Sequence, residues 1–518
     1  MMRLTTFAPL WLSLLLSLYV ACCASCNDTV AEEVAVVFEP SDFAPWTITP
    51  QQRQGFNLIV PGALERTPRD YTKVAARLQT TGRSSVQIAM VDILDREYCG
   101  PVVRLAPARE TEVAVDLSAV GHPLSMLRTV RLYAEGSPVR IVNLRIYCAA
   151  EKLPTPDVVV KGPLDETSIQ AALDSLGEAG GVVHIPAGTY MINNTVTVPR
   201  DNVTIYGDGA ATVFKATWYS AKPMLLLAGR KNVRITRLRF QGWPETAFRG
   251  YNEAQYAAKP EDAGRADNVM TRAVDINDCD NVRFDHSTVE LCGHTGLLIK
   301  GEGLVLVDHC FFQKNFRYGY GYGVVPHATK ACYIEDTNFE NHRHGVAGSS
   351  NSMASYICRF NRFVKDVKAV PEEGWKQVTS HEIDVHHGCG WLYAHDNYVE
   401  MKNAMMSSGV CLRGNSGWVY RHLLVNCNIG VYVVGASDDI WTWDNTCRDV
   451  PTPQLSKATG SIHFDQKPDN FAEIPYPNEL NRLAWWPGAE DGSATILHPE
   501  TQFAGPEDAQ VLRLAADK

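Results

Sequence analysis

The sequence predicts a right-handed parallel β-helix preceded by a small β-sandwich. Strand-like segments recur along residues 151–450, and short runs of alternating apolar and polar residues fill the region before them. The length of 518 residues agrees with this architecture. One hydrophobic core normally stops growing below that size, whereas a solenoid simply adds coils.

Residues 1–26 have the layout of a secretory signal peptide. Arg3 precedes an apolar run from Leu10 to Ala21, and small residues then close the segment. A lipoprotein signal is the alternative because cysteines follow the run, although Tyr19 stands where such a signal usually carries Leu. We therefore expect a secreted, periplasmic or outer-surface protein with no transmembrane segment after signal removal.

The bulk composition narrows the class of protein. The chain is 45% hydrophobic and 20% charged, as folded soluble proteins are. The formal net charge of −10 argues against a nucleic-acid partner, and the sequence leaves the oligomeric state open. Many of the 14 cysteines lie among apolar residues, about one per repeat, as small core side chains would; these are Cys292, Cys310, Cys332, Cys358, Cys411 and Cys427. A disulfide is expected only between Cys99 and Cys148.

Residues 27–150 are expected to form the β-sandwich. The runs at residues 85–91 and 130–133 alternate apolar and polar side chains, and Gly, Pro and Asp separate such runs. Alternation of this kind is typical of antiparallel sheets with one solvated face. A sandwich before a sugar-active domain resembles a carbohydrate-binding module, and a purely structural cap is the alternative.

A helix and a buried strand open the predicted β-helix. Asp165-Glu166-Thr167 predicts the start of a short amphipathic helix, and residues 180–190 (GGVVHIPAGTY) predict a strand and a turn. This stretch resembles the opening of pectate-lyase-like β-helix proteins, which include polysaccharide lyases and glycoside hydrolases. In those proteins a helix covers the first open coil and a G-G-x-V-x-x-P-x-G-x-Y strand begins the stack. The resemblance spans roughly residues 164–446 and implies the fold more specifically than the reaction.

The repeat supports the same fold independently. One strand series starts near residues 232, 281, 303, 331, 355, 390, 417 and 439, and several of its intervals are 22 to 28 residues long. A second series follows glycine at residues 296–299, 323–325, 345–347, 409–412 and 430–433. Stacked turn amides are expected at Asn338, Asn361, Asn397 and Asn445. Insertions at 243–267 and 365–379 are expected to shape a cleft, and residues 451–518 to pack on or cap the helix.

Histidines concentrate in three segments, at residues 320–327, 341–345 and 381–387. Aligning the strands by their valines puts Val324, Val346, Val385 and Val410 in one column, which would bring the three segments within a few coil spacings of about 4.8 Å. Strand alternation then places Glu382, Asp384 and His386 on one outer face, with Arg343 in the column of Glu382.

The candidate site residues come from these segments and their neighbours. The candidate catalytic residues are Tyr322, Arg343, His344 and His381. The candidate substrate-binding residues are His342, Trp375, Glu382, Asp384, His386 and Arg413. The strings Arg343-His344-x-x-Ala347-Gly348 and Ser380-His381-x-x-Asp384-x-His386 resemble motifs of a subset of β-helix proteins. Trp375, Trp391 and Trp418 are candidates either for stacking on sugar rings or for filling the core.

A polysaccharide lyase is the first of the mechanisms that these residues suggest. Arg343 would neutralise a uronate carboxylate, His344 or His381 would remove the C5 proton, and Tyr322 or another histidine would protonate the leaving oxygen. Histidine suits the role of base because its ordinary pKa lies near neutrality.

Three alternatives remain open. A glycoside hydrolase would use two of Asp336, Glu382 and Asp384 as acid and base. His381, Asp384 and His386 have ligand types that suit a divalent cation, although no cofactor or metal ligand is assigned. A non-catalytic, adhesin-like β-helix would bind glycans without converging ionisable groups. The sequence predicts an exported enzyme that acts on a polysaccharide, with an acidic glycan as the expected substrate.

Overall fold

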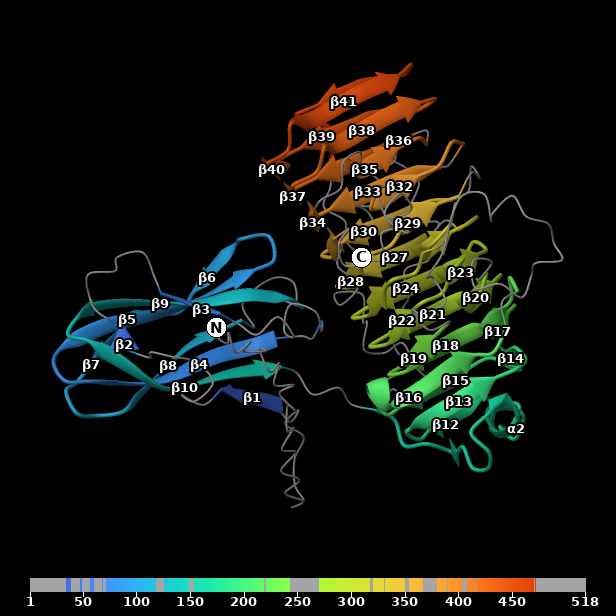
Figure 1. Ribbon diagram of the computed structural model, residues 1–518, viewed down its shortest axis with the longest axis horizontal. Coiled ribbons are helices and arrows are strands. Elements are labelled where there is room, and N and C mark those ends of the chain that lie inside the picture. Colours follow the sequence, from blue (N-terminus) through green and yellow to red (C-terminus); the bar gives the residue numbers. More distant parts are fainter. Residues whose placement is uncertain are drawn as a thin grey trace, which may run out of the picture.

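The computed structural model contains an N-terminal pair of antiparallel sheets and a long stack of parallel coils (Figure 1). It describes residues 34–38, 47–48, 56–59, 68, 71–117, 125–148, 153–218, 220–242, 270–316, 320–329, 331–349, 354–366, 380–388, 390–402, 408–414, 416–469 and 471. The predicted signal peptide, the insertion at 243–267 and most of that at 365–379 lie outside these residues. None of the described helices has the length and apolarity needed to cross a bilayer.

The N-terminal domain is the predicted β-sandwich. One sheet has the strand order β1-β10-β4-β8 with β2 beside β10, and the other has the order β3-β9-β5-β6 with β7 beside β5. The strands are β1 (Val34–Phe38), β2 (Thr47–Ile48), β3 (Phe56–Ile59), β4 (Tyr71–Thr80), β5 (Ser84–Asp92), β6 (Glu97–Cys99), β7 (Val103–Leu105), β8 (Thr111–Asp116), β9 (Leu127–Gly136) and β10 (Val139–Cys148). Val74 and Ile146 from the first sheet and Ile88 and Leu132 from the second share one buried cluster, so the two sheets pack face to face.

The expected disulfide between Cys99 and Cys148 is wrong, because these two described cysteines are not joined by a disulfide. Cys99 is exposed on β6, whereas Cys148 is buried at the end of β10 in the opposite sheet. Because one side chain is exposed and the other is buried in the opposite sheet, the two sulfur atoms do not come close enough to form a disulfide bond.

The remainder of the described chain is a right-handed parallel β-helix with three sheets, in which each strand from β12 to β39 pairs with the strand three places later. The first sheet consists of β11 (Val158–Val159), β12 (Gly181–Ile185), β15 (Val203–Gly207), β18 (Lys231–Thr236), β21 (Asp280–Asp285), β24 (Leu304–Asp308), β27 (Ala331–Glu335), β30 (Tyr356–Arg359), β33 (Trp391–His395), β36 (Ser416–Tyr420), β39 (Ile440–Trp443) and β42 (Ile462–Phe464). The second consists of β13 (Gly188–Ile192), β16 (Thr212–Ala216), β19 (Arg239–Gln241), β22 (Thr288–Glu290), β25 (Phe311–Gln313), β28 (Asn338–Glu340), β31 (Arg362–Asp366), β34 (Tyr398–Lys402), β37 (Leu423–Val425) and β40 (Thr446–Arg448).

The third sheet carries the segments that are rich in histidine. It consists of β14 (Val196–Thr197), β17 (Pro223–Ala228), β20 (Arg272–Asn277), β23 (Thr295–Lys300), β26 (Tyr322–Pro326), β29 (His344–Gly348), β32 (Ile383–Val385), β35 (Ser408–Leu412), β38 (Ile429–Gly435) and β41 (Thr452–Ala458). Strands β41 and β42 lie beyond residue 450 and continue the stack. Each coil thus contributes one strand to each sheet, one more than the two series found in the sequence.

The predicted helix is α2 (Glu166–Asp174), and it covers the first coil (Figure 1). The Asp165 side chain accepts the backbone N–H groups of Thr167 and Ser168, which is the N-cap that the sequence predicts. Ile169 and Leu173 are fully buried in the same core cluster as the strands of the helix. A short 3₁₀ turn, η2 (Gly209–Ala211), precedes β16.

Core columns run along the axis because equivalent residues stack from coil to coil. Phe312, Phe339 and Phe363 occupy one such column in the second sheet, with centroid distances of 5.1 and 4.7 Å between successive rings. Five of the six repeat cysteines are part of this core, as predicted. Cys411 is the exception: it is buried but stacks on Asp384, outside the apolar interior.

The predicted amide ladder exists between the first and second sheets. Asn361 N–H donates to Asn397 Oδ1 at 3.0 Å, and Asn361 Oδ1 accepts from Thr337 N–H at 3.0 Å. Asn445 Oδ1 accepts from His422 N–H at 3.0 Å. Asn338 does not belong to the ladder, because it begins β28 and accepts from the Arg362 guanidinium instead.

The sandwich contacts the outer face of the second sheet. Ile93 and Met126 pack against Val364, Tyr398 and Leu423 in one buried cluster. Three polar contacts surround this cluster: Arg96 pairs with Asp396, Asp95 with Arg448, and Ser125 with Asp336. The sandwich therefore lies against the β-helix along its flank.

Candidate active site

The candidate site lies on the outer face of the third sheet, on four successive strands. Tyr322 of β26 stands beside His344 of β29, and Asp384 of β32 stands between Ala347 and Cys411 of the neighbouring coils. Ile383 and Val385 alternate with Asp384 and enter the core, as predicted. Stacking thus brings together residues that are 60 or more positions apart in the sequence.

The predicted column of valines is wrong at one position. Val324 pairs with Val346, but Val346 pairs with Ile383, and Ile383 in turn with Val410. A shift of two residues keeps the same side chains facing the core, so alternation alone could not detect it. One consequence is that Glu382 lies opposite Gly345 and not Arg343, as its 2.9 Å hydrogen bond from Gly345 N–H shows.

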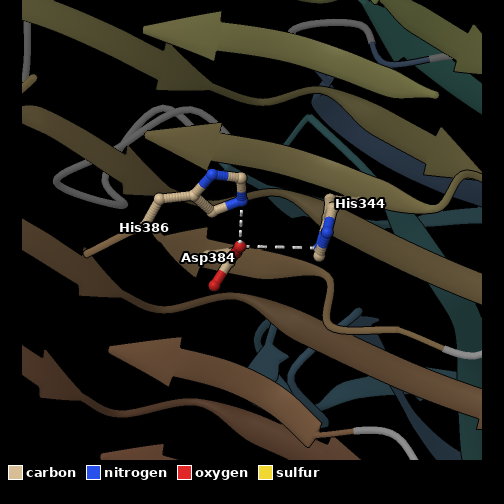
Figure 2. A group of neighbouring side chains, drawn as sticks. All are labelled: His344, Asp384 and His386. Atoms are coloured by element: carbon tan, nitrogen blue, oxygen red, sulfur yellow. Dashed lines mark ion pairs between the residues drawn. The ribbon is translucent and has the colours of Figure 1, made fainter. Parts of the chain in front are cut away.

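Asp384 is the centre of the site (Figure 2). Its carboxylate accepts from the Arg413 guanidinium through two nitrogens, and His386 Nε2 lies 2.8 Å from Oδ2. His344 Nδ1 is 3.8 Å from the same oxygen. Burial alone would raise the pKa of Asp384, but His344, His386 and Arg413 outweigh it and hold the pKa well below its usual value. Asp384 is therefore a buried carboxylate that stays ionised.

His386 is oriented by this carboxylate and remains accessible. Its side chain is 26% exposed, whereas Asp384 is fully buried. Because the Asp384 carboxylate is ionised, it can only accept, so the His386 proton resides on Nε2. In the neutral ring Nδ1 is then the unprotonated nitrogen, and it can accept a proton from a substrate.

Tyr322 supplies a protonated phenol beside the dyad of Asp384 and His386. The Arg343 guanidinium donates to the Tyr322 hydroxyl at 2.8 Å, and the Tyr322 ring stacks on His344 with 5.3 Å between centroids. Burial raises the pKa of Tyr322 above its usual value, although Arg343 opposes this shift. The hydroxyl therefore keeps its proton at neutral pH.

His344 and His381 are neutral side chains held by hydrogen bonds. His344 is buried, and its Nδ1–H donates to the His381 carbonyl at 3.0 Å. Burial puts the pKa of His344 well below its usual value and lowers that of His381 to about 4. His381 Nδ1 lies 2.6 Å from the Ser408 hydroxyl. Both predicted bases thus lie at the site with one nitrogen already engaged.

Two predicted substrate-binding residues lie inside the coils instead. His342 is fully buried, and its Nδ1 accepts from Asn315 N–H at 3.2 Å. Glu382 is 1% exposed and pairs with Lys365 at 3.1 Å. Glu382 precedes the first residue of β32, so the alternation that places Asp384 outward does not apply to it. These placements correct the sequence-based assignment of both residues.

The aromatic and acidic alternatives are not part of this group. Trp375 lies outside the described residues. Trp391 and Trp418 belong to a cluster on the first sheet, where Trp418 is fully buried. Asp336, proposed for hydrolysis, is fully buried and accepts from the Ser125 hydroxyl of the sandwich at 2.7 Å, so it faces a different side of the solenoid.

A divalent cation fits poorly among His344, Asp384 and His386, although ligand atoms of these three residues lie within 4.8 Å of one another. The Arg413 guanidinium already contacts both oxygens of Asp384, and a cation there would have to displace this positive charge. His381, Asp384 and Cys411 form a second such group, but burial raises the pKa of the Cys411 thiol well above its usual value.

Three residues of the site were missed in the sequence: Lys365, Ser408 and Cys411. Ser408 and Cys411 belong to the Gly-Val strand β35, where they stand two residues before and one residue after the buried Val410, so their neighbours were visible in the repeat. Lys365 was assigned to the start of an insertion, but it belongs to β31 and is fully buried. The position of Lys365 directly after Phe363 and Val364 of the repeat strand was the available signal.

Comparisons with known proteins concern the β-helix. A family model described as rhamnogalacturonase A/epimerase, pectate lyase-like, matches residues 164–392. No functionally curated protein matches the sequence. A polygalacturonase from Erwinia carotovora ssp. carotovora is similar at 12% identity and a TM-score of 0.42, over 61% of this chain and 99% of that one.

Two further solved structures are similar at comparable levels. An endo-xylogalacturonan hydrolase from Aspergillus tubingensis has 11% identity and a TM-score of 0.41, over 58% of this chain and 87% of that one. An alginate lyase from Paenibacillus sp. str. FPU-7 has 10% identity and a TM-score of 0.38, over 59% of this chain and 99% of that one. At such identities the activities in these names do not transfer to the present chain.

Proposed function

The chain contains a pectate-lyase-like parallel β-helix, and on this basis we propose that it is a carbohydrate-active enzyme that cleaves a uronate-containing polysaccharide by β-elimination. The observation that carries the proposal is the Asp384–His386 pair, in which a buried, ionised carboxylate orients a partly exposed imidazole at 2.8 Å. A histidine held in this way can act as a general base through its other ring nitrogen.

The reaction starts at C5 of the uronate in this scheme. His386 Nδ1 takes the C5 proton, and the electron pair of the C5–H bond becomes the C4=C5 double bond as the C4–O bond breaks. The leaving oxygen takes the proton of the Tyr322 hydroxyl. Asp384 stabilises the imidazolium that forms on His386, and Arg343 holds the hydroxyl of Tyr322 in place through its 2.8 Å hydrogen bond.

The two arginines give the site its preference for an acidic glycan. Arg413 uses two nitrogens for Asp384, and its side chain is 23% exposed, so N–H groups remain for a substrate carboxylate. Arg343 lies at the other side of Tyr322. Negative charge moves toward the uronate carboxylate when C5 loses its proton, and guanidinium groups stabilise that charge.

Proton abstraction by His386 replaces the roles predicted for His344 and His381. Each of those residues has Nδ1 engaged, His344 with the His381 carbonyl and His381 with Ser408. Their lowered pKa values also make them weak proton acceptors. In this proposal His344 and His381 support the positions of Tyr322 and Asp384 and do not transfer protons.

Hydrolysis by paired carboxylates is the alternative reaction. It requires a second carboxyl group that faces the substrate at about 5 to 9.5 Å from the first. The nearest one along the chain, Glu382, is directed toward Lys365 within the coil. Among the described residues, elimination therefore has the better set of side chains.

Incubation with a panel of uronate polysaccharides distinguishes the two reactions. We expect new ultraviolet absorbance from the unsaturated uronate, which appears together with new reducing ends. Reducing ends without absorbance would point to hydrolysis, and no cleavage of any polyuronate would refute the proposal. Export through the N-terminal segment is part of the same proposal, and N-terminal sequencing of the protein from the culture medium or the cell envelope tests it.

A further inference from the structure

A buried ion pair lies inside the coil, directly behind the candidate site. Lys365 and Glu382 are 0% and 1% exposed, and Lys365 Nζ is 3.1 Å from Glu382 Oε1. Lys365 also donates to the carbonyls of Arg343 and Ser380, at 3.2 and 3.0 Å. Lys365 therefore makes two hydrogen bonds to backbone carbonyls and one ion pair with Glu382.

Glu382 extends the same network to the neighbouring coils. Its Oε2 accepts from Gly345 N–H at 2.9 Å, and its backbone carbonyl accepts from Val346 N–H at 2.9 Å. Its own N–H donates to the Gly409 carbonyl at 3.3 Å. A Cβ at residue 345 would lie 3.0 Å from Glu382 Oε2 and 2.5 Å from the Phe363 ring, so only glycine permits this close approach.

The network joins the turns that present the candidate catalytic groups. One turn carries Arg343 and His344, and the other carries Ser380 and His381 ahead of Asp384. The hydrogen bond from His344 to the His381 carbonyl crosses between the same two turns. Small movements of either turn would change the positions of Arg343 and Tyr322 relative to Asp384.

Stability alone does not explain a charged pair at this position. Burying two charges costs free energy, and well-packed apolar side chains of similar volume often serve as well or better. Apolar side chains could not bind the carbonyls of Arg343 and Ser380 or the N–H of Gly345. The pair thus supplies directed contacts that an apolar interior lacks.

We propose that Lys365 and Glu382 are positioning residues, which fix the Arg343 turn against the Asp384 strand in the geometry that the reaction requires. The inference rests on the proposed function for its catalytic consequence. Its structural consequence, protection of the Gly345 and Val346 amides, does not depend on any activity.

The test is the double variant Lys365→Met/Glu382→Gln, compared with Glu335→Gln/Arg359→Met. The first removes both charges while an amide oxygen remains for Gly345 N–H. The control removes another buried pair, 2.8 Å apart with both side chains at most 1% exposed, on the first sheet. We expect kcat on a polyuronate to fall about 10- to 100-fold in the first variant, with a smaller change in KM and no comparable loss in the control.

Hydrogen exchange provides the second measurement on the same proteins. Peptides that contain Gly345 and Val346 should exchange about tenfold faster in the Lys365→Met/Glu382→Gln variant than in the wild type or the control. Unchanged exchange together with unchanged kcat would overturn the inference. If the wild type cleaves no polyuronate, the proposed function fails, and the exchange measurement alone decides whether the pair holds the two turns.

Discussion

Asp384 is the central charged side chain of the site. It is fully buried, and its ionised form is held by the Arg413 guanidinium and by the His386 Nε2–H. Arg413 and His386 are both partly exposed, so they can be solvated when the carboxylate is removed. The residue therefore matters more for the reaction than for the fold.

The Asp384→Asn variant tests this assignment. Unlike the carboxylate, an amide can donate its NH2 to His386 and so favour the wrong tautomer, and it carries no charge to stabilise an imidazolium, so we expect kcat to fall by about 10²- to 10⁴-fold. The measurement is the initial rate of ultraviolet absorbance on a polyuronate. Asp308→Asn is the matched control, because Asp308 is equally buried and paired with Arg283 but lies on the first sheet. Equal rates in the two variants would remove Asp384 from the mechanism.

At the scale of elements, the amide ladder shows how a solenoid satisfies its buried turns. Asn397 N–H donates to His422 Nδ1 at 3.3 Å, so a histidine occupies one rung of a ladder otherwise built from asparagine. Accepting at Nδ1 requires the neutral ring with its proton on Nε2. Burial lowers the pKa of His422 to about 4.

Buried histidines such as His422 therefore predict that the protein loses stability in mild acid. The unfolded chain protonates its histidines near pH 6.5, but folded His422 and His381 do so near 4 and His342 near 3. Between these values the unfolded state binds more protons, so the free energy of unfolding falls as the pH is lowered from about 6.5 to about 4. Each fully neutral histidine contributes a slope of up to about 1.4 kcal/mol per pH unit.

The His422→Asn variant isolates one of these contributions. Asparagine offers an amide oxygen to Asn397 N–H and does not titrate, so the pH slope should become shallower by about one proton. Chemical denaturation at several pH values between 7 and 4.5 measures the slope. A slope identical to that of the wild type would show that protonation of His422 is not linked to unfolding.

At the scale of the whole molecule, the sandwich and the solenoid share a buried interface. Met126 and Ile93 are 2% and 7% exposed where they meet Val364, Tyr398 and Leu423. Ion pairs at Arg96 and Asp95 border this patch. An apolar patch with a polar border is typical of interfaces that hold two domains in one orientation.

The Met126→Asp variant should uncouple the two domains. A charge in this patch would be buried without a partner, so we expect the sandwich to detach and calorimetry to resolve two unfolding transitions where the wild type shows stronger coupling. Val102→Asp is the control, because Val102 is 65% exposed on the same sandwich. Identical thermograms for the two variants would show that this patch does not couple the two domains.

The solenoid and its cap could be predicted because their signals are local and periodic. The N-cap at Asp165, the inward Ile383 and Val385 and the rungs at Asn361 and Asn397 all follow from patterns within one coil. The coil period also predicted that Tyr322, His344 and Asp384 converge, since stacking places equivalent positions in contact.

What the sequence determined by itself was the β-helix, the sandwich and three of the four strands that carry the site. The tertiary structure alone decided the two-residue register at Ile383, the burial of Glu382 against Lys365 and the selection of His386 as the accessible histidine. Alternation has a period of two, so it fixes which face a strand residue takes but not its partner in the next coil. The alternation also ends at the bends between strands, and several side chains of the candidate site lie at those bends.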